Sequence, residues 1–272
     1  MCAAFRASEP ALITSRRNPL VRQLRQLHTP VGRREQGLLL VEGTHLVQEV
    51  VRLGLTPQHL LVTDDWCTRH GPLLQALDAE PILVSQEVLA AVATTDHPDG
   101  VVLTLQPPSP ADQGTDFVLV LDGIQDPGNL GTLLRTALAA GIQQVWLAGG
   151  ADPLQPKVLR ASAGAALALP QQRLERDGVI ALVQQAVAGG SQVVAAVPPA
   201  AADSRPYWLL DWRRPTLLLL GAEGAGLSAT LLEQATQRVC IPHSDAVESL
   251  NVAVAAAPLL LERWRQERMP GN

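Results

Sequence analysis

The residues best suited to chemistry in this chain begin in a glycine-rich turn of its last third. Gly221, Gly224 and Gly226 surround Glu223 directly after the apolar run 217–220. Glycine is favoured where a backbone turns sharply or where a ligand approaches it closely. A structural turn accounts for one glycine, but three of them around a carboxylate favour ligand contact. Their order, G-x-x-G-x-G, does not match the dinucleotide-binding fingerprint.

A second polar stretch follows at 240–251 and leads into the final apolar segment. Ser249 and Asn251 stand where a new apolar periodicity begins, which is typical of a helix start. Ser249 is a conceivable nucleophile, but no histidine forms a recognisable triad with it, and His243 alone is weak support. We therefore favour a helix-capping or ligand-contact role for Ser249. Two such loops near strand ends can form a pocket lined by main-chain groups.

A cation lies upstream, on a segment that the pattern predicts to be a helix. The turn-forming sequence 126–129 leads into apolar residues that recur at helical spacing and form one packed stripe. Arg135 projects away from that stripe beside small neighbours, so its side chain is free to reach a substrate. Taken alone, Arg135 is more simply a surface arginine. The stripe consists of Leu130, Leu133, Leu134, Ala137 and Leu138.

Segments that alternate between strand and helix patterns position these residues, so the predicted fold class is α/β. A proline-rich segment indicates two domains, with an N-terminal domain at 1–105, a linker at 106–115 and a C-terminal domain at 116–272. The expected strands are 38–41, 60–63, 81–85, 101–105, 117–121, 145–148, 193–197 and 217–220, and the expected helices include 18–27, 44–53, 72–77 and 157–169.

The composition suits a chain that buries a substantial core, since 47% of the residues are hydrophobic and 17% are charged. The formal net charge of −5 argues mildly against a nucleic-acid partner, but binding depends on local patches. Residues 16–34 hold six arginines and no acidic residue. A solvated face is the usual meaning of a charged run, yet exposed helices ordinarily mix signs, so we favour phosphate contact. These arginines are Arg16, Arg17, Arg22, Arg25, Arg33 and Arg34.

The three cysteines share no CxxC spacing, which indicates reduced thiols in a cytosolic protein. The N-terminal sequence lacks the apolar core of a signal peptide, and no apolar run approaches membrane-spanning length. Cys67 and His70 lie close together in sequence, but two ligands do not make a zinc site. We therefore expect a cytoplasmic protein with neither a bound metal nor a membrane segment.

The polar stretches and the upstream helix together resemble the motifs of the SpoU/TrmH family of RNA ribose methyltransferases, in the SPOUT superfamily. The motifs occur in order and at familiar spacings, and a looser resemblance extends over the N-terminal part. The matching residues are Asn129, Gly131 and Arg135, then Gly221, Glu223 and Gly224, then Ile241 and Pro242, and finally Ser249, Leu250 and Asn251.

The resemblance implies methyl transfer from S-adenosylmethionine to a ribose 2′-hydroxyl of structured RNA, most simply ribosomal RNA. It assigns Arg135 to activation of that hydroxyl, with Asn129 and Glu223 orienting Arg135 and the ribose, and Asn251 completing the site. The cofactor is expected to be held largely by main-chain groups of the two loops. The matching cofactor positions are Gly221, Gly224, Ile241, Pro242, Ser249 and Leu250.

The resemblance also implies a parallel sheet that ends in a trefoil knot, a homodimer with its active site near the subunit interface, and an N-terminal RNA-binding domain. Two alternatives stay open: a transfer RNA target, and a catalytically silent RNA-binding or ribosome-assembly factor. The complete set of motif residues argues against the silent factor. From the charge pattern, we place RNA contact at Arg16, Arg17, Arg22 and Arg25.

Overall fold

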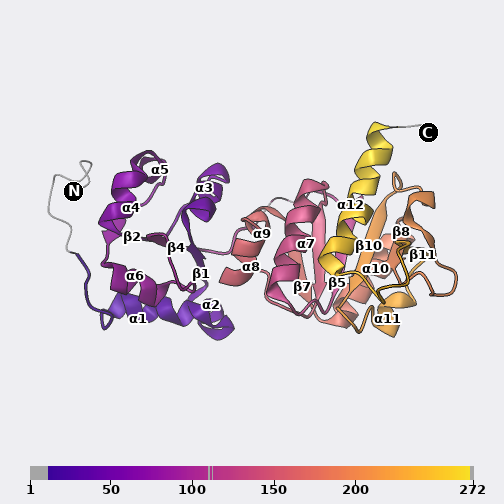
Figure 1. Cartoon of the computed structure of the whole chain (residues 1–272), viewed down its shortest axis with the longest axis horizontal. Helices are drawn as coiled ribbons and strands as arrows, with labels where there is room; N and C mark the ends of the chain where they lie inside the picture. The colour runs from indigo at the N-terminus through magenta and orange to yellow at the C-terminus, as the bar shows by residue number, and fades with distance from the viewer. Residues whose placement is uncertain (1–11, 110, 112, 270–272) are drawn as a thin grey trace. The chain divides into compact units, whose positions relative to one another are not determined.

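A computed structural model describes residues 12–109, 111 and 113–269 of the chain (Figure 1). These residues form two compact units. The N-terminal unit comprises the described residues up to Pro108 together with Asp152–Ala168. The C-terminal unit comprises the described residues of Ser109–Ala151 and those from Leu169 onward. Each unit has its own β-sheet, which confirms the expected pair of α/β domains.

The N-terminal unit contains a four-stranded sheet of order β1-β4-β2-β3. β4 pairs antiparallel with both β1 and β2, whereas β2 and β3 run parallel. Side chains of β1, β2 and β4 share a core with the apolar faces of α1 and α6, including Leu24 and Leu89. The strands are β1 (Leu39–Glu42), β2 (His59–Val62), β3 (Pro81–Leu83) and β4 (Val101–Leu105).

Short capped helices surround this sheet. Asn18 and Thr29 each accept a main-chain N–H with their side chains, and a proline follows each of them at the first helical position. Thr63 and Ser85 cap two further helices in the same way. The helices are α1 (Pro19–Arg25), η1 (Gln26–His28), α2 (Pro30–Gln36), α3 (Thr44–Arg52), α4 (Asp64–Arg69), α5 (Gly71–Gln75) and α6 (Gln86–Val92).

A segment from much later in the sequence completes the N-terminal unit. It carries α8 (Pro156–Ala161) and α9 (Ala165–Ala168), whereas one helix was expected over 157–169. That expectation was wrong, because Ala163 and Gly164 have φ angles of 48° and 83°, which no α-helix accommodates. The linker at 106–115 had placed this segment with the C-terminal domain, but in the structure it packs with the N-terminal unit.

Two ion pairs hold this segment within the N-terminal unit. The Nη2 atom of Arg33 lies 2.6 Å from Asp152 Oδ2, and the Nη1 atom of Arg160 lies 2.5 Å from Glu42 Oε1. Arg33 and Glu42 are both buried, so removal of Asp152 or Arg160 leaves an uncompensated charge in the interior.

The C-terminal unit is built on a seven-stranded sheet of order β7-β6-β5-β10-β8-β11-β9, in which every pair is parallel. The strands β5 and β10 lie near its centre and read as uninterrupted apolar runs because both of their faces are covered. The strands are β5 (Phe117–Asp122), β6 (Gln144–Ala148), β7 (Gln171–Leu174), β8 (Gln192–Ala196), β9 (Arg205–Pro206), β10 (Thr216–Gly221) and β11 (Gln237–Cys240).

The helices of this unit pack on its sheet and on one another, with α12 lying against α7 (Figure 1). None of the described helices is long and apolar enough to span a membrane. The trefoil knot implied by the family resemblance stays a prediction. The helices are α7 (Pro127–Ala139), α10 (Arg176–Ala188), η2 (Tyr207–Leu209), α11 (Ala229–Leu232) and α12 (Val252–Arg268).

Candidate active site

The motif residues converge at the carboxyl ends of β5 and β10. The two strands pair in register, so Asp122 at the end of β5 lies beside Gly221 at the end of β10. After β5 the chain turns into α7, where the side chain of Asp126 accepts the main-chain N–H of Asn129 at 2.8 Å and caps the helix. This cap places Asn129 in the first turn of α7, next to the strand ends where ligands bind in parallel α/β sheets.

Three predicted catalytic residues form one hydrogen-bonded group, which we call the Asn–Glu–Asn cluster (Asn129, Glu223 and Asn251). Asn129 donates from Nδ2 to Glu223 Oε1 at 2.5 Å. Asn251 donates from Nδ2 to Asn129 Oδ1 at 3.0 Å. Asn129 therefore connects the loop that carries Glu223 to the loop that ends at Asn251. It lies 94 positions before Glu223 and 122 positions before Asn251 in the sequence.

Asn251 also starts the final helix. Its Oδ1 atom accepts the main-chain N–H groups of Ala253 at 2.9 Å and Val254 at 3.2 Å. The helix-capping role expected as one possibility for Ser249 thus belongs to Asn251, and the exposed Ser249 makes no side-chain hydrogen bond to any described residue. The Oδ1 atom of Asn251 accepts from α12 and its Nδ2 group donates to Asn129, so these hydrogen bonds fix the orientation of the side-chain amide.

The glycine loop (residues 221–228) is a tight hairpin. Ala222 and Gly226 exchange two main-chain hydrogen bonds, at 2.9 and 3.1 Å. A methyl group on Gly221 would lie 2.0 Å from the carbonyl carbon of Gly226, so the space beside Gly221 is filled by the loop's own backbone. Gly224 and Gly226 have φ angles of 80° and 68°, and nothing lies within 4 Å of the positions that their side chains would occupy. The loop therefore presents open backbone at Gly224 and Gly226, whereas Gly221 closes the hairpin.

The second predicted cofactor loop runs from the end of β11 to Asn251. Ile241 and Leu250 are partly buried at its two ends, whereas Pro242 and the residues 244–249 are exposed. The Ile241 carbonyl lies 2.8 Å from Nδ1 of His243, which restrains the turn after β11. The exposed middle of this loop leaves its main-chain groups accessible to a ligand.

Arg135 lies apart from the Asn–Glu–Asn cluster. It is exposed on α7, six residues after Asn129, which corresponds to roughly 9 Å along the helix axis and a different face. Its guanidinium makes no hydrogen bond or ion pair with another residue that the structure describes. The side chain projects away from the packed stripe as predicted, since four of the five stripe residues of α7 are buried; its contact with a substrate stays a prediction.

The basic run of residues 16–34 divides in the structure. Arg33 is buried. It donates from Nη1 to the Leu27 carbonyl at 2.9 Å and forms an ion pair with Asp152. Its charge is therefore used inside the N-terminal unit and is not available for phosphate contact. The other five arginines are exposed, and none has a side-chain partner among the described residues: Arg16, Arg17, Arg22, Arg25 and Arg34.

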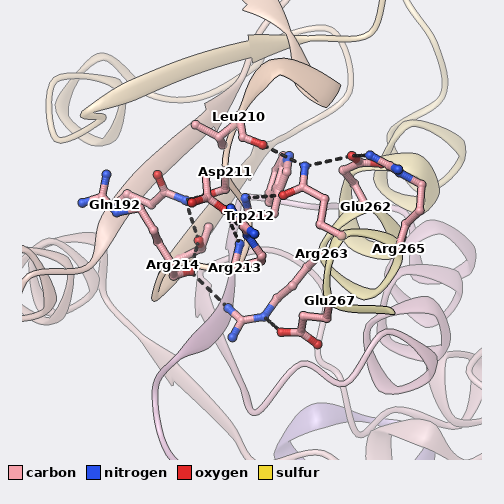
Figure 2. A network of polar contacts seen from close by, with 12 residues as sticks. Gln192, Leu210, Asp211, Trp212, Arg213, Arg214, Glu262, Arg263, Arg265 and Glu267 are labelled. Atoms are coloured by element: carbon pink, nitrogen blue, oxygen red, sulfur yellow. Dashed lines mark hydrogen bonds and ion pairs between the residues drawn. The ribbon is translucent and has the colours of Figure 1, made fainter. Parts of the chain in front are cut away.

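A polar network anchors the second half of α12 to the segment that precedes β10 (Figure 2). Gln266 accepts the main-chain N–H of Trp212 at 2.9 Å and donates to the Leu210 carbonyl at 2.8 Å. Arg263 donates to the carbonyl of Arg214 at 3.2 Å. These contacts fix the helix that Asn251 caps.

Two carboxylates of the network, Asp211 and Glu262, have pKa values below their ordinary values. Hydrogen bonds from the Arg265 guanidinium, and secondarily from Gln266, lower the pKa of Glu262 below its ordinary value, although burial opposes that shift.

Two carboxylates that hold the site together were not among the predicted site residues. Asp126 was placed in the turn that leads into a helix, and the structure adds that its side chain caps α7. Asp122 is buried at the end of β5, where a charge directly after an apolar run is unusual. Among the described residues, no group of three or more histidine, cysteine, aspartate or glutamate side chains could hold a metal ion.

Comparison with known proteins agrees with this arrangement. The model of the SpoU rRNA Methylase family matches residues 116–261, and that of the MRM3-like substrate binding domain matches residues 18–103. An uncharacterized tRNA/rRNA methyltransferase of Synechocystis is 46% identical over 271 residues, covering 96% of each chain. The 23S rRNA (guanosine(2553)-2′-O)-methyltransferase of Bacillus subtilis is 34% identical over 249 residues, covering 91% of this chain and 97% of its own.

A solved structure shares the whole architecture. The AdoMet-bound rRNA methyltransferase of Sinorhizobium meliloti superposes with a TM-score of 0.80 at 31% identity, and the match covers 94% of this chain and 98% of that one. Similarity therefore extends over both units, and the match to the SpoU rRNA Methylase family includes all of the motif residues. The chain belongs to the SpoU/TrmH family of RNA 2′-O-ribose methyltransferases, in the SPOUT superfamily.

Proposed function

We propose that this protein methylates a ribose 2′-hydroxyl of ribosomal RNA, with S-adenosylmethionine as the methyl donor. The observation that carries the proposal is the Asn–Glu–Asn cluster, in which three motif residues from separate parts of the chain meet beside the glycine loop. The rRNA methyltransferases of Bacillus subtilis and Sinorhizobium meliloti support the choice of RNA.

The residues present fit S-adenosylmethionine. Gly224 and Gly226 leave open space beside the glycine loop, and the loop between β11 and α12 is exposed. In our proposal, main-chain groups of both loops hold the cofactor, and Leu250 and Ile241 supply apolar contact. When bound, the sulfonium supplies an activated methyl group and a good leaving group.

The protein's own residues then align and activate the hydroxyl. Asn129 and Glu223 orient the ribose, and Asn251 fixes the amide of Asn129. Arg135 acts as a cation near a phosphate or the developing alkoxide, because its guanidinium carries a positive charge and several N–H donors. The hydroxyl proton leaves to another acceptor.

A homodimer is proposed from the family and from the surface of α12. Val254, Leu261 and Trp264 are 62%, 44% and 46% exposed, and their spacing places them along one side of the helix. α12 packs against α7, the helix that carries Arg135, so a partner on this side would lie near the site. Sedimentation velocity of the wild type and of a Leu261→Glu variant tests the state: the variant should be monomeric.

We assign RNA affinity to the N-terminal unit, because four exposed arginines lie in α1 and in the residues just before it. They are Arg16, Arg17, Arg22 and Arg25. Transfer RNA remains the alternative target, because the Synechocystis relative is named for both RNA classes. A silent RNA-binding factor is disfavoured by the complete motif set. The cysteine pattern supports a cytoplasmic protein.

The replacement Arg135→Ala tests the catalytic assignment. We expect methyl transfer to fall by at least 100-fold while the Kd for S-adenosylmethionine stays within about twofold, because removal of a transition-state contact affects turnover and not cofactor binding. Arg214→Ala is the matched control, since Arg214 is also exposed in the C-terminal unit but lies outside the motifs. Turnover near the wild-type rate in Arg135→Ala would remove Arg135 from the mechanism.

A further inference from the structure

Asp122 is a buried charge at the carboxyl end of β5, in the C-terminal unit. It is the last residue of β5, is 2% exposed, and stands in register between Gly221 of β10 and Ala148 of β6. A carboxylate in such a position destabilises the fold unless its oxygens are paired and hydrogen-bonded. Its partners therefore indicate what the charge holds in place.

Both carboxylate oxygens of Asp122 are used. Oδ1 accepts from Arg176, at 3.2 Å from Nε and 3.0 Å from Nη2. Oδ2 accepts the main-chain N–H of Ser228 at 2.8 Å. Arg176 is the first residue of α10, and Ser228 directly precedes α11 at the exit of the glycine loop. One side chain thus links three elements that are far apart in sequence.

The contact with Ser228 fixes the end of the glycine loop, while strand pairing fixes its beginning at Gly221 beside Asp122. Between these two points the hairpin carries Glu223, whose carboxylate accepts the hydrogen bond of Asn129. Displacement of Ser228 would move the hairpin as a unit, because the two hydrogen bonds between Ala222 and Gly226 keep it closed.

We propose that Asp122 is a positioning residue for methyl transfer, which sets the glycine loop so that Glu223 meets Asn129. Asp122 does so through its hydrogen bond to Ser228 at the end of the loop. The inference rests on the proposed roles of the glycine loop and of Glu223. It adds a residue whose effect on catalysis passes through another side chain.

The test uses the full-length protein with Asp122→Asn and Asp122→Ala. Asparagine keeps an oxygen for the Ser228 N–H but loses the charge opposite Arg176, whereas alanine loses both contacts. We expect Asp122→Ala to raise the Kd for S-adenosylmethionine by about tenfold or more and to lower kcat, with Asp122→Asn intermediate. Glu42→Ala is the matched control, because it also removes a buried carboxylate paired with a partly exposed arginine, and Glu42 is not among the proposed site residues. It should lower the melting temperature while leaving Kd and kcat unchanged well below that temperature.

A double-mutant cycle of Asp122→Asn with Glu223→Ala separates positioning from general stability. If Asp122 acts through Glu223, the losses in kcat are strongly less than additive, whereas independent effects add. Additive losses, or wild-type Kd and kcat in folded Asp122→Asn, would overturn the inference. If instead Gly224→Val leaves cofactor affinity unchanged, the proposed role of the glycine loop fails, and this outcome is distinguishable from a failure at Asp122 alone.

Discussion

Replacement of Gly221 by alanine probes how the glycine loop is built. A methyl group at this position would lie 2.0 Å from the carbonyl carbon of Gly226 and 2.2 Å from the main-chain nitrogen of Leu227. Both neighbours are backbone atoms, which cannot swing aside as a flexible side chain can. The hairpin between Ala222 and Gly226 must therefore open or shift to accept the substitution.

The expected effect follows from the contacts that would be lost. Two main-chain hydrogen bonds close the hairpin, and each contributes roughly 0.5–1.5 kcal/mol. Their loss disfavours the closed loop by about 1–3 kcal/mol. Since a factor of ten in affinity corresponds to about 1.4 kcal/mol, the apparent Kd for S-adenosylmethionine should rise by roughly 5–150-fold.

Isothermal titration calorimetry with S-adenosylmethionine measures this change directly. Gly189→Ala is the matched control, because it adds the same methyl group in the same unit, and its nearest neighbour would be 3.3 Å away. We expect the control to bind like the wild type. A folded Gly221→Ala protein with wild-type affinity would refute the argument that closure of the hairpin is required for cofactor binding.

Two further predictions concern charge. Replacement of four exposed arginines by glutamine should weaken RNA binding and reduce the slope of log K against log salt by roughly 3–4, since each phosphate contact contributes about 0.7–0.9; an unchanged slope in filter-binding assays would show that these side chains are merely solvated. Because the pKa of Glu262 is lowered in the folded state, its stabilisation is present above the ordinary value of 4.5 and is lost as the pH falls below it. Urea unfolding at pH 7 and pH 3.5 should therefore show a larger difference for the wild type than for Glu262→Gln, and equal differences would exclude this carboxylate as a contributor. The four arginines are Arg16, Arg17, Arg22 and Arg25.

The central strands could be predicted from the sequence because burial on both faces imposes uninterrupted apolar runs, as in β5 and β10. Local backbone geometry could not be predicted in the same way. The pattern of 157–169 suits a helix of small residues, and only the left-handed conformations at Ala163 and Gly164 divide it. The helix α10 received no assignment, since Val179 and Val183 are its only buried residues and leave a weak apolar stripe.

In the candidate site, too, the residue types could be predicted from the sequence but their contacts could not. Motif residues identified Asn129, Glu223 and Asn251, but their hydrogen bonds depend on the parallel pairing of β5 with β10, which periodicity does not specify. Charge pattern alone could not separate Arg33 from its exposed neighbours, because its partner Asp152 lies 119 residues away.

The ion pairs of the N-terminal unit also determine how its proposed role in RNA binding should be tested. Deletion of residues 1–105 would remove Arg33 and Glu42 and leave Asp152 and Arg160 without their partners. The apolar side chains of α8 and α9 would become exposed as well. Loss of activity in such a truncated protein would therefore not report on RNA affinity alone, and substitution of the exposed arginines in the full chain is the cleaner experiment.

The most direct test of the proposed function is to incubate the purified protein with ribosomal RNA, transfer RNA and methyl-labelled S-adenosylmethionine, and then to map the modified nucleotide. We predict label in ribosomal RNA, on a ribose 2′-oxygen at a defined nucleotide that resists alkaline hydrolysis, and no label with Arg135→Ala. Label on a base, label confined to transfer RNA, or no label from a folded protein that binds S-adenosylmethionine would contradict the proposal.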